Sequence, residues 1–240
     1  MRTCFILAGI AVCLAGTPAY GADFATITGK IKVTGDELPP PEQKLINKDP
    51  EVCGTGQREI HWYKKAADGL LDETVVFLEG DYEEASWESS EATKDLLQEG
   101  CVFKPYIDIW RNGSEITITS KDPAAHNIHT YERIGMVRRD LFNFNQPKED
   151  VRTVVIKPRR SHFVELTCDN HDLMAGWRFV ATNPYCTVAK GGSFTLKVPA
   201  GSHTLKVWHP MMGELEEEIE VEAGEEKTVN FEFEYFEYEE

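Results

Sequence analysis

Residues 168–174 read Cys-Asp-Asn-His-Asp-Leu-Met, and this stretch decides how the chain is interpreted. It places a thiol, an imidazole and a thioether at Cys168, His171 and Met174, directly after an apolar run typical of a β-strand. Three soft to borderline ligands on one short loop favour copper over magnesium or calcium. Zinc is the chemical rival because it also binds cysteine and histidine, but methionine is not among its usual ligands.

A copper site of this kind needs a second imidazole, and residues 126–129 (His-Asn-Ile-His) offer two candidates. His126 and His129 are three residues apart, so on a regular strand they point to opposite faces. Both can bind one ion only if the strand bulges between them. Strand facing by itself leaves both His126 and His129 as candidates for this ligand.

Together, His-Asn-Ile-His and Cys-x2-His-x2-Met resemble the cupredoxin family, in its amicyanin-like form with a short metal loop. The resemblance extends over residues 100–184, which begin with Phe-x-Pro at 103–105 and a strand-like Glu-Ile-Thr-Ile-Thr at 115–119. It implies a Greek-key sandwich that holds one mononuclear copper ion, cycling between Cu(I) and Cu(II), for single-electron transfer. The implied ligands are His126, Cys168 and His171, with Met174 as a long axial ligand.

The resemblance also implies a role for Asn127, whose backbone N–H would donate to the cysteine sulfur and whose side chain would join the two metal loops. The loop departs from the family at Asp169, Asn170 and Asp172, where threonine and two prolines are common. We therefore expect two carboxylates beside an exposed His171. Their charge would favour Cu(II) and would suit a redox partner with a basic docking surface.

The rest of the chain reads as nearly all β, with period-2 alternation in short runs such as 26–33, 74–78, 151–156, 194–198 and 228–235. We expect an all-β protein in which the Greek-key cupredoxin sandwich packs with a second, discontinuous β-sandwich. Residues 86–99 alone have helical composition, although a solvated loop fits them equally well.

The second sandwich resembles the carboxypeptidase regulatory-like (transthyretin-like) family. Residues 191–233 carry its Gly-x-Phe-x-Leu strand and Pro-Ala-Gly turn, whereas its first strands match residues 27–35 and 74–78. The predicted division is therefore 22–99 plus 185–240 for this sandwich, with the copper domain 100–184 inserted between its halves.

Residues 1–21 read as a signal peptide, because one basic residue precedes a short apolar run and a small-residue cleavage site. This predicts a periplasmic or otherwise exported protein with no transmembrane segment in the mature chain. Loss of the peptide, in which Arg2 is the only charged residue, changes the formal net charge from -16 to -17. So acidic a chain excludes nucleic acid as a partner.

Four cysteines remain in the mature chain, and export permits disulfides. With Cys168 held by copper, three are left, so at least one is unpaired within the monomer. We predict a Cys53–Cys101 disulfide and a free, buried Cys186. A Cys53–Cys186 disulfide is the rival pairing.

One further cluster, His209 with Met211 and Met212, offers ligands for Cu(I), but we interpret it as a strand end and a turn. No catalytic triad, carboxylate pair or phosphate-binding glycine motif is recognisable, so we predict a protein that is not an enzyme. The alternative to electron transfer is a copper-binding module for copper sensing, sequestration or delivery.

Overall fold

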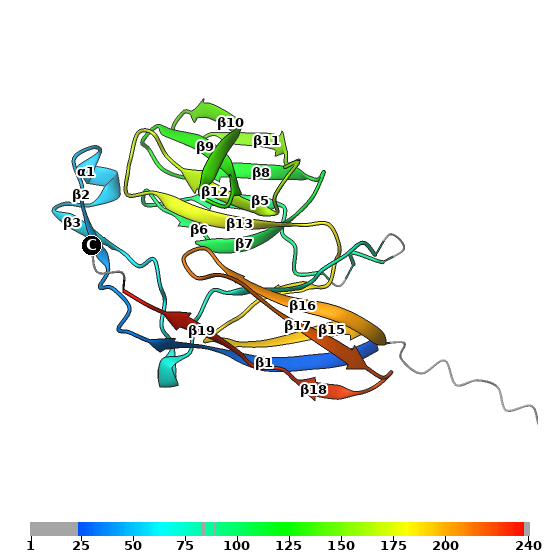
Figure 1. The fold of residues 1–240 in the computed structure, drawn as a ribbon. Coiled ribbons are helices and arrows are strands. Elements are labelled where there is room, and N and C mark those ends of the chain that lie inside the picture. Colours follow the sequence, from blue (N-terminus) through cyan, green and yellow to red (C-terminus); the bar gives the residue numbers. More distant parts are fainter. Residues whose placement is uncertain (1–23, 83–84, 89, 238–240) are drawn as a thin grey trace, which may run out of the picture.

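The computed structural model describes residues 24–82, 85–88 and 90–237, and this part of the chain is nearly all β. Its strands form two groups of sheets, one above the other in Figure 1. We call the lower group the terminal sandwich, because it contains both ends of the described chain, and the upper group the central sandwich. The predicted all-β fold class is confirmed. The predicted signal peptide lies outside the described residues.

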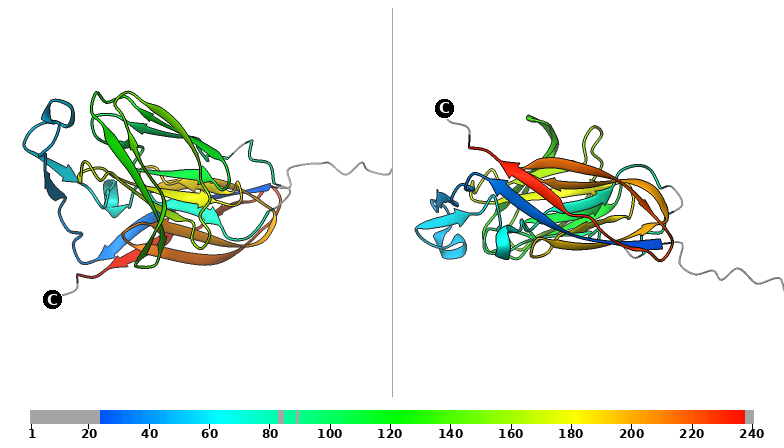
Figure 2. Two further views of the ribbon diagram at one scale, coloured as in Figure 1. Left: turned by 90° about the horizontal axis from the view of Figure 1, so that it is seen from above. Right: turned by 60° about the horizontal axis from the view of Figure 1, so that its bottom comes forward.

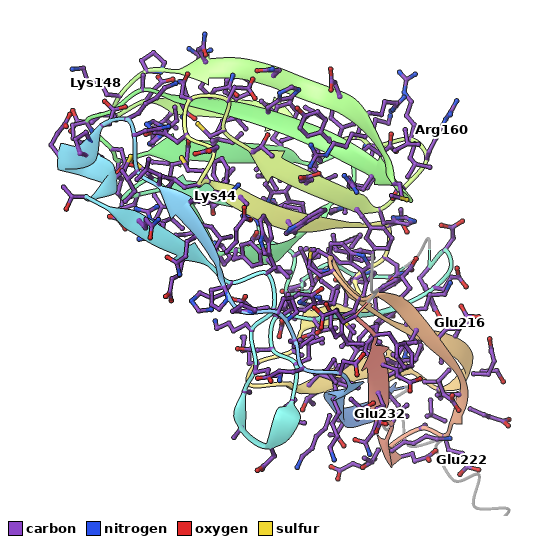
Figure 3. The ribbon with its side chains drawn as sticks, turned by 60° about the vertical axis from the view of Figure 1, so that its left-hand side comes forward. Lys44, Lys148, Arg160, Glu216, Glu222 and Glu232 are labelled. Carbon is purple, nitrogen blue, oxygen red and sulfur yellow. A yellow bond between two sulfur atoms is a disulfide. The ribbon has the colours of Figure 1, made fainter. Side chains whose placement is uncertain are left out.

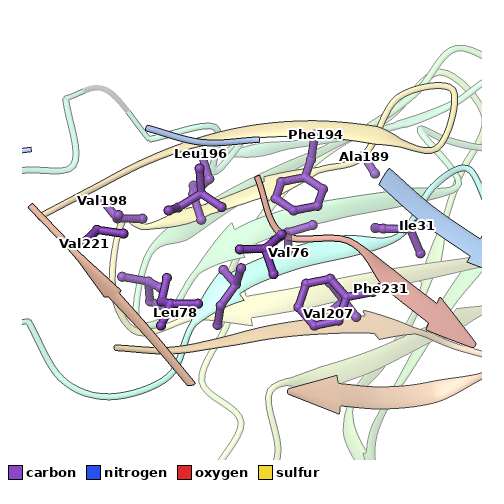
Figure 4. Packing of buried hydrophobic residues seen from close by; sticks show 14 of the residues in the cluster. Ile31, Val76, Leu78, Ala189, Phe194, Leu196, Val198, Val207, Val221 and Phe231 are labelled. Carbon is purple, nitrogen blue, oxygen red and sulfur yellow. The ribbon is translucent and has the colours of Figure 1, made fainter. Parts of the chain in front are cut away.

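The terminal sandwich consists of two four-stranded sheets. The first contains β1 (Phe24–Gly35), β15 (Ser193–Pro199), β18 (Glu226–Thr228) and β19 (Phe231–Tyr235). The second contains β14 (Cys186–Val188), β4 (Val75–Leu78), β16 (Gly201–His209) and β17 (Gly213–Val221). Alternate residues of both sheets point inward and form one apolar core, part of which is drawn in Figure 4.

Strand β1 pairs with strands from the C-terminal end of the chain, in agreement with the placement of residues 27–35 and 191–233 in one discontinuous sandwich. It pairs antiparallel with β15 and parallel with β18 and β19, with Ile31 opposite Phe231 and Val33 opposite Phe233. The right-hand view of Figure 2 shows β1 (blue) and β19 (red) side by side. A Cβ atom on Gly29 would lie 1.8 Å from the Val229 carbonyl oxygen, so only glycine allows this close approach.

This pairing predicts that residues 185–240 do not fold alone. Without β1, the first sheet loses the strand that pairs with β15, β18 and β19, and without β4 the second sheet loses the strand between β14 and β16. A fragment of residues 185–240 should therefore show no cooperative thermal unfolding by circular dichroism, whereas the mature chain should. A cooperative transition of the fragment would contradict the proposed split of this sandwich.

The central sandwich has a five-stranded sheet of order β10-β9-β12-β13-β7 facing a four-stranded sheet of order β11-β8-β5-β6. The first contains β7 (Ile107–Arg111), β9 (His126–Ile134), β10 (Val137–Gln146), β12 (Phe163–Thr167) and β13 (Ala175–Ala181). The second contains β5 (Asp95–Gln98), β6 (Phe103–Lys104), β8 (Glu115–Ser120) and β11 (Val151–Val155). Because β5 precedes residue 100, the sandwich begins slightly earlier in the chain than the proposed insertion.

Strand β5 also corrects the helical interpretation of residues 86–99. Residues 95–98 pair with β8 and β6, and the described residues before them form turns and loop. Leu96 is fully buried in the core of the central sandwich, and Gln98 is buried too. The helical composition was misleading because burial of alternate residues in a sheet outweighs weak helix propensity.

The two sandwiches share an apolar contact layer. Strands β4, β14 and β16 contribute Phe77, Cys186 and Trp208, while β7 and β13 contribute residues such as Ile109 and Phe179. Phe77 packs on Phe179 with ring centroids 4.3 Å apart. This layer positions the central sandwich against the terminal one.

The remaining elements are short. A two-stranded sheet of β2 (Glu42–Leu45) and β3 (Gln57–Ile60) is joined by the single-turn helix α1 (Pro50–Cys53), and a 3-10 turn, η1, covers Ala67–Gly69. Among the described residues, no helix has the length and apolar character needed to cross a membrane.

Candidate metal centre

The central sandwich brings the two predicted metal loops together at one end of its larger sheet. His126 is the first residue of β9, Cys168 follows the last residue of β12, and Met174 precedes the first residue of β13. Strands β9 and β12 are antiparallel neighbours, with His129 opposite Thr167. The start of β9 and the end of β12 therefore lie side by side, although they are about 40 residues apart in the chain.

Three of the predicted ligands form a compact buried group. The Nδ1 atoms of His126 and His171 are 3.2 Å apart, and the Cys168 sulfur lies 3.7 Å from Nδ1 of His171. Ligand atoms of all three residues lie within 4.8 Å of one another. The exposed fractions are 0% for His126, 4% for Cys168 and 2% for His171.

Each imidazole is held from its far side by a carboxylate. Nε2 of His126 lies 2.7 Å from Asp122 Oδ2, and Nε2 of His171 lies 2.9 Å from Asp49 Oδ2. An ionised carboxylate only accepts hydrogen bonds, so an imidazole that is neutral beside it carries its hydrogen on Nε2. Both Nδ1 atoms then present lone pairs to each other and to the sulfur.

This donor set fits a metal ion. Facing lone pairs repel unless a cation or a shared proton lies between them. Burial lowers the pKa of His126, although Asp122 opposes this change. The lowered pKa favours the neutral form of the ring, which is the form that binds metal. The histidine–carboxylate pairs are the arrangement that orients metal-bound imidazoles in proteins.

Backbone N–H groups surround the Cys168 sulfur in addition to the two histidines. The N–H of Asn127 points at it across 3.3 Å. Burial raises the pKa of the Cys168 thiol, while backbone hydrogen bonds, first among them that from Asn127, oppose the rise. A bound cation would supply the further stabilisation that a buried thiolate needs.

The Asn127 side chain joins the two metal loops. Its Oδ1 accepts a hydrogen bond from the N–H of Asp169 at 3.3 Å, and its Nδ2 donates to Oδ1 of Asn143 on β10 at 2.7 Å. The structure thus places Asn127 between the loops, at the position that the resemblance implies.

Met174 completes the turn after His171. Its N–H donates to the His171 carbonyl oxygen at 3.0 Å, and its side chain is 2% exposed. It belongs to the same buried cluster as Cys168. Its role as axial ligand stays a prediction.

His129 lies outside the ligand group. Its Nδ1 is 3.1 Å from Asp169 Oδ1 and 2.9 Å from the Tyr131 hydroxyl, and its Nε2 is 3.4 Å from Asp140 Oδ1. The ring is partly exposed, whereas His126 is fully buried.

The cluster at His209, Met211 and Met212 is not assembled as a metal site. His209 is buried, and burial lowers its pKa to about 3, which keeps the ring neutral. It stacks on Tyr63 and accepts a hydrogen bond from the Met211 N–H at 3.3 Å. Met211 is exposed, and Met212 packs against the core of the terminal sandwich. This geometry matches a strand end followed by a turn.

The expectation of an exposed His171 beside Asp169 and Asp172 is wrong. The ring is 2% exposed, and the carboxylate that contacts it belongs to Asp49. Asp169 instead contacts His129 and accepts a hydrogen bond from Asn143 Nδ2 at 3.2 Å. His171 is buried because the segment that contains α1 lies over it.

The predicted Cys53–Cys101 disulfide is confirmed, with an S–S distance of 1.97 Å. Its sulfurs lie within 4.8 Å of a ring nitrogen of His171, so it borders the candidate site. Cys186 is free and 2% exposed, as predicted, and burial raises its pKa to about 12.

Asp49 and Asp122 are the site residues that sequence reasoning missed. Asp122 lies four positions before His126, so its place in the motif was a usable signal. Burial raises the pKa of Asp122, but hydrogen bonds from the N–H groups of Cys101 and Gly100 and from His126 outweigh it, and the net pKa is lowered. Asp49 carries no such local signal, because it is 122 residues from His171.

No family model and no curated protein matches this chain. Among solved structures, it is similar to a purple cupredoxin from Nitrosopumilus maritimus, at 17% identity and a TM-score of 0.32 over 37% of this chain and 100% of that one. It is also similar to a reduced Cu(I) form of an amicyanin variant, at 14% identity and a TM-score of 0.31 over 44% of this chain and 98% of that one.

A copper-containing nitrite reductase from Thermus scotoductus is similar at 12% identity and a TM-score of 0.30. The match covers 36% of this chain but only 22% of the reductase. Because these TM-scores describe a partial likeness, the assignment of the site rests on its own geometry.

Proposed function

We propose that this protein binds one copper ion through Nδ1 of His126, Nδ1 of His171 and the Cys168 thiolate, and that it transfers single electrons. Met174 is the proposed axial ligand. The observation that carries the proposal is the convergence of two lone-pair nitrogens and a sulfur in one buried group, with each imidazole oriented by a carboxylate. Two histidines and a cysteine with a distant methionine form the ligand set of blue-copper electron-transfer sites.

Copper bound there would supply one-electron chemistry between Cu(I) and Cu(II). The chain's own residues hold the ligands in place and keep water away. The ligands come from the ends of paired strands, and the Asn127 N–H donates to the sulfur, so little rearrangement accompanies a change in charge. Zinc fits these residues less well, because a buried thioether is not among its usual ligands.

We also propose that the protein is exported and works outside the cytoplasm. The Cys53–Cys101 disulfide is typical of an oxidising compartment, in agreement with the signal peptide expected from residues 1–21. We also propose that the terminal sandwich is a carboxypeptidase regulatory-like domain that carries the copper domain as an insertion. The formal net charge of -17 after loss of the signal peptide supports a redox partner with a basic docking surface.

Copper sensing, sequestration or delivery is the second candidate function, and the burial of His171 favours it. A partner cannot touch an imidazole that is 2% exposed, whereas close contact with a ligand favours fast electron transfer. A covered site is well suited to retaining its metal ion. This function uses the same ligands and differs in whether the bound copper cycles reversibly.

Titration of the mature, copper-free protein with Cu(II) tests the proposal. We expect one equivalent to produce an intense visible absorption band and a narrow copper hyperfine splitting by EPR, because the thiolate donates charge to Cu(II). Reversible electrochemical reduction of the coloured complex would support electron transfer. Tight Cu(I) binding without reversible cycling would support copper handling, and a protein that binds neither Cu(II) nor Cu(I) would contradict both functions.

A further inference from the structure

Residues 42–60, which we call the cap, cover the outer side of His171. The cap comprises β2, α1 and β3, and it packs on the central sandwich beside the metal loops (Figure 3, where Lys44 marks β2). Ile46, Val52 and Ile60 pack against the same buried cluster that contains Cys168 and Met174. The cap is thus part of the wall of the site. It is separate in sequence from β9, β12 and β13, whose ends carry the candidate ligands.

Asp49 connects the cap directly to the ligand group. Its Oδ2 lies 2.9 Å from Nε2 of His171, on the side of the ring opposite Nδ1. Its carbonyl oxygen accepts hydrogen bonds from the N–H groups of Val52 and Cys53 at 2.9 and 2.8 Å. Asp49 adopts the left-handed conformation, with φ 46°, which aspartate tolerates better than most residues. Backbone geometry therefore holds its carboxylate in place.

Two sets of contacts fasten the cap beside Asp49. The disulfide links Cys53, at the end of α1, to Cys101 of the central sandwich. The guanidinium of Arg58 on β3 donates to the carbonyl oxygens of Cys53, Gly100 and Cys101. A carboxylate on a freely moving segment would lose side-chain and backbone entropy on contacting His171, whereas here the crosslink has already restricted the segment.

The Cys101 half of the disulfide is connected to the other imidazole, that of His126, by Asp122. The N–H groups of Gly100 and Cys101 donate to the Asp122 carboxylate at 2.6 and 2.8 Å, and Asp122 contacts His126. Cys101 therefore binds the Asp122 carboxylate directly, whereas Cys53 binds the backbone carbonyl of Asp49. Each of the two carboxylates contacts one imidazole. The crosslink organises the surroundings of both nitrogen ligands.

We propose that Asp49, held by the cap and its disulfide, is a positioning residue for the copper ligand His171, and that the cap closes the copper ion off from direct contact with a protein partner or chelator. This inference rests on the proposed copper site. An anionic acceptor at Nε2 makes the imidazole a stronger donor and so stabilises Cu(II) more than Cu(I). The cap also has to open before another molecule can reach the ion.

The test compares Asp49→Asn with wild type and with Glu51→Gln in the mature, copper-loaded protein. Asparagine keeps the shape and an acceptor oxygen, so the change removes mainly the charge. Glu51 lies on α1, two residues after Asp49, and is exposed, so its replacement removes one charge from the same segment without removing a contact to His171. Asp49→Glu tests rescue by a second carboxylate.

Outer contacts to metal ligands change metal affinity by about 10- to 100-fold. Because the Asp49 side chain is 39% exposed, we expect the lower end of this range. Asp49→Asn should weaken Cu(II) binding relative to Cu(I) about tenfold, which corresponds to a reduction potential about 59 mV higher. Because the variant weakens one contact that holds the cap against the site, it should also transfer Cu(I) to the chelator bathocuproine disulfonate faster than wild type. Glu51→Gln should change neither quantity, and Asp49→Glu should recover most of the potential.

Equal potentials and transfer rates in wild type, Asp49→Asn and Glu51→Gln would overturn the inference while leaving the copper site intact. A wild-type protein that binds no copper would overturn the proposed function instead. In that case nitrogen-15 NMR of the copper-free protein decides the inference. A slowly exchanging Nε2–H on His171 that is lost in Asp49→Ala supports it, and rapid exchange in wild type overturns it.

Discussion

Replacement of Cys168 by serine is expected to abolish the intense visible band of the copper-loaded protein. The band requires a thiolate bound to Cu(II), and a serine hydroxyl neither ionises readily nor donates charge at visible wavelengths. The measurement is a Cu(II) titration followed by absorption and EPR spectroscopy. Cys186→Ser is the matched control, because it also removes a buried free thiol but one outside the ligand group.

The same titration shows whether His126 or His129 is the copper ligand. His126→Ala should bleach the site, since Nδ1 of His126 faces that of His171 at 3.2 Å. His129→Ala should leave most of the colour, because that ring contacts Asp169, Asp140 and Tyr131 instead. Bleaching by His129→Ala together with a coloured His126→Ala variant would show that the upstream ligand is assigned wrongly.

Removal of the Cys53–Cys101 disulfide by a double substitution to serine is expected to lower the free energy of unfolding by about 4 kcal/mol. The estimate follows from the loop entropy of a crosslink spanning 48 residues, and native-state strain would reduce it. Urea unfolding of the copper-free protein measures the change without the contribution of metal binding. Cys186→Ala removes one buried sulfur atom and closes no loop, so it should cost much less.

The double variant should also release the cap. Once copper-loaded, it should lose Cu(I) to a chelator faster than wild type, because the segment that holds Asp49 is no longer crosslinked. A loss of stability below about 1 kcal/mol would contradict the entropic account of the disulfide. Unchanged Cu(I) transfer would mean that Arg58 and the apolar contacts of Ile46, Val52 and Ile60 hold the cap without it.

Local pattern was enough to predict many of the strands, although not β5, and to propose most residues of the candidate site. Alternation at 26–33 and 228–235 predicted the strands that pair as β1 and β19, because burial of one face of a sheet demands period 2. The ligand candidates were recognisable because three of them fall on one seven-residue loop, and His126 stands in a four-residue motif with Asn127. The number of cysteines and the position of Cys53 in a glycine-rich turn favoured the Cys53–Cys101 pairing, but the sequence left Cys53–Cys186 open until the structure showed the disulfide.

What lies over the ligands was decided by tertiary structure alone. Cys-x2-His-x2-Met specifies the chemistry of the loop, yet it says nothing about whether His171 meets water or another segment. The contact between His171 and Asp49 joins residues 122 apart, and it depends on the packing of the cap and on its crosslink. Sequence spacing encodes contacts within a strand or a loop because backbone geometry sets them, whereas contacts between distant segments arise only when the chain buries its apolar side chains.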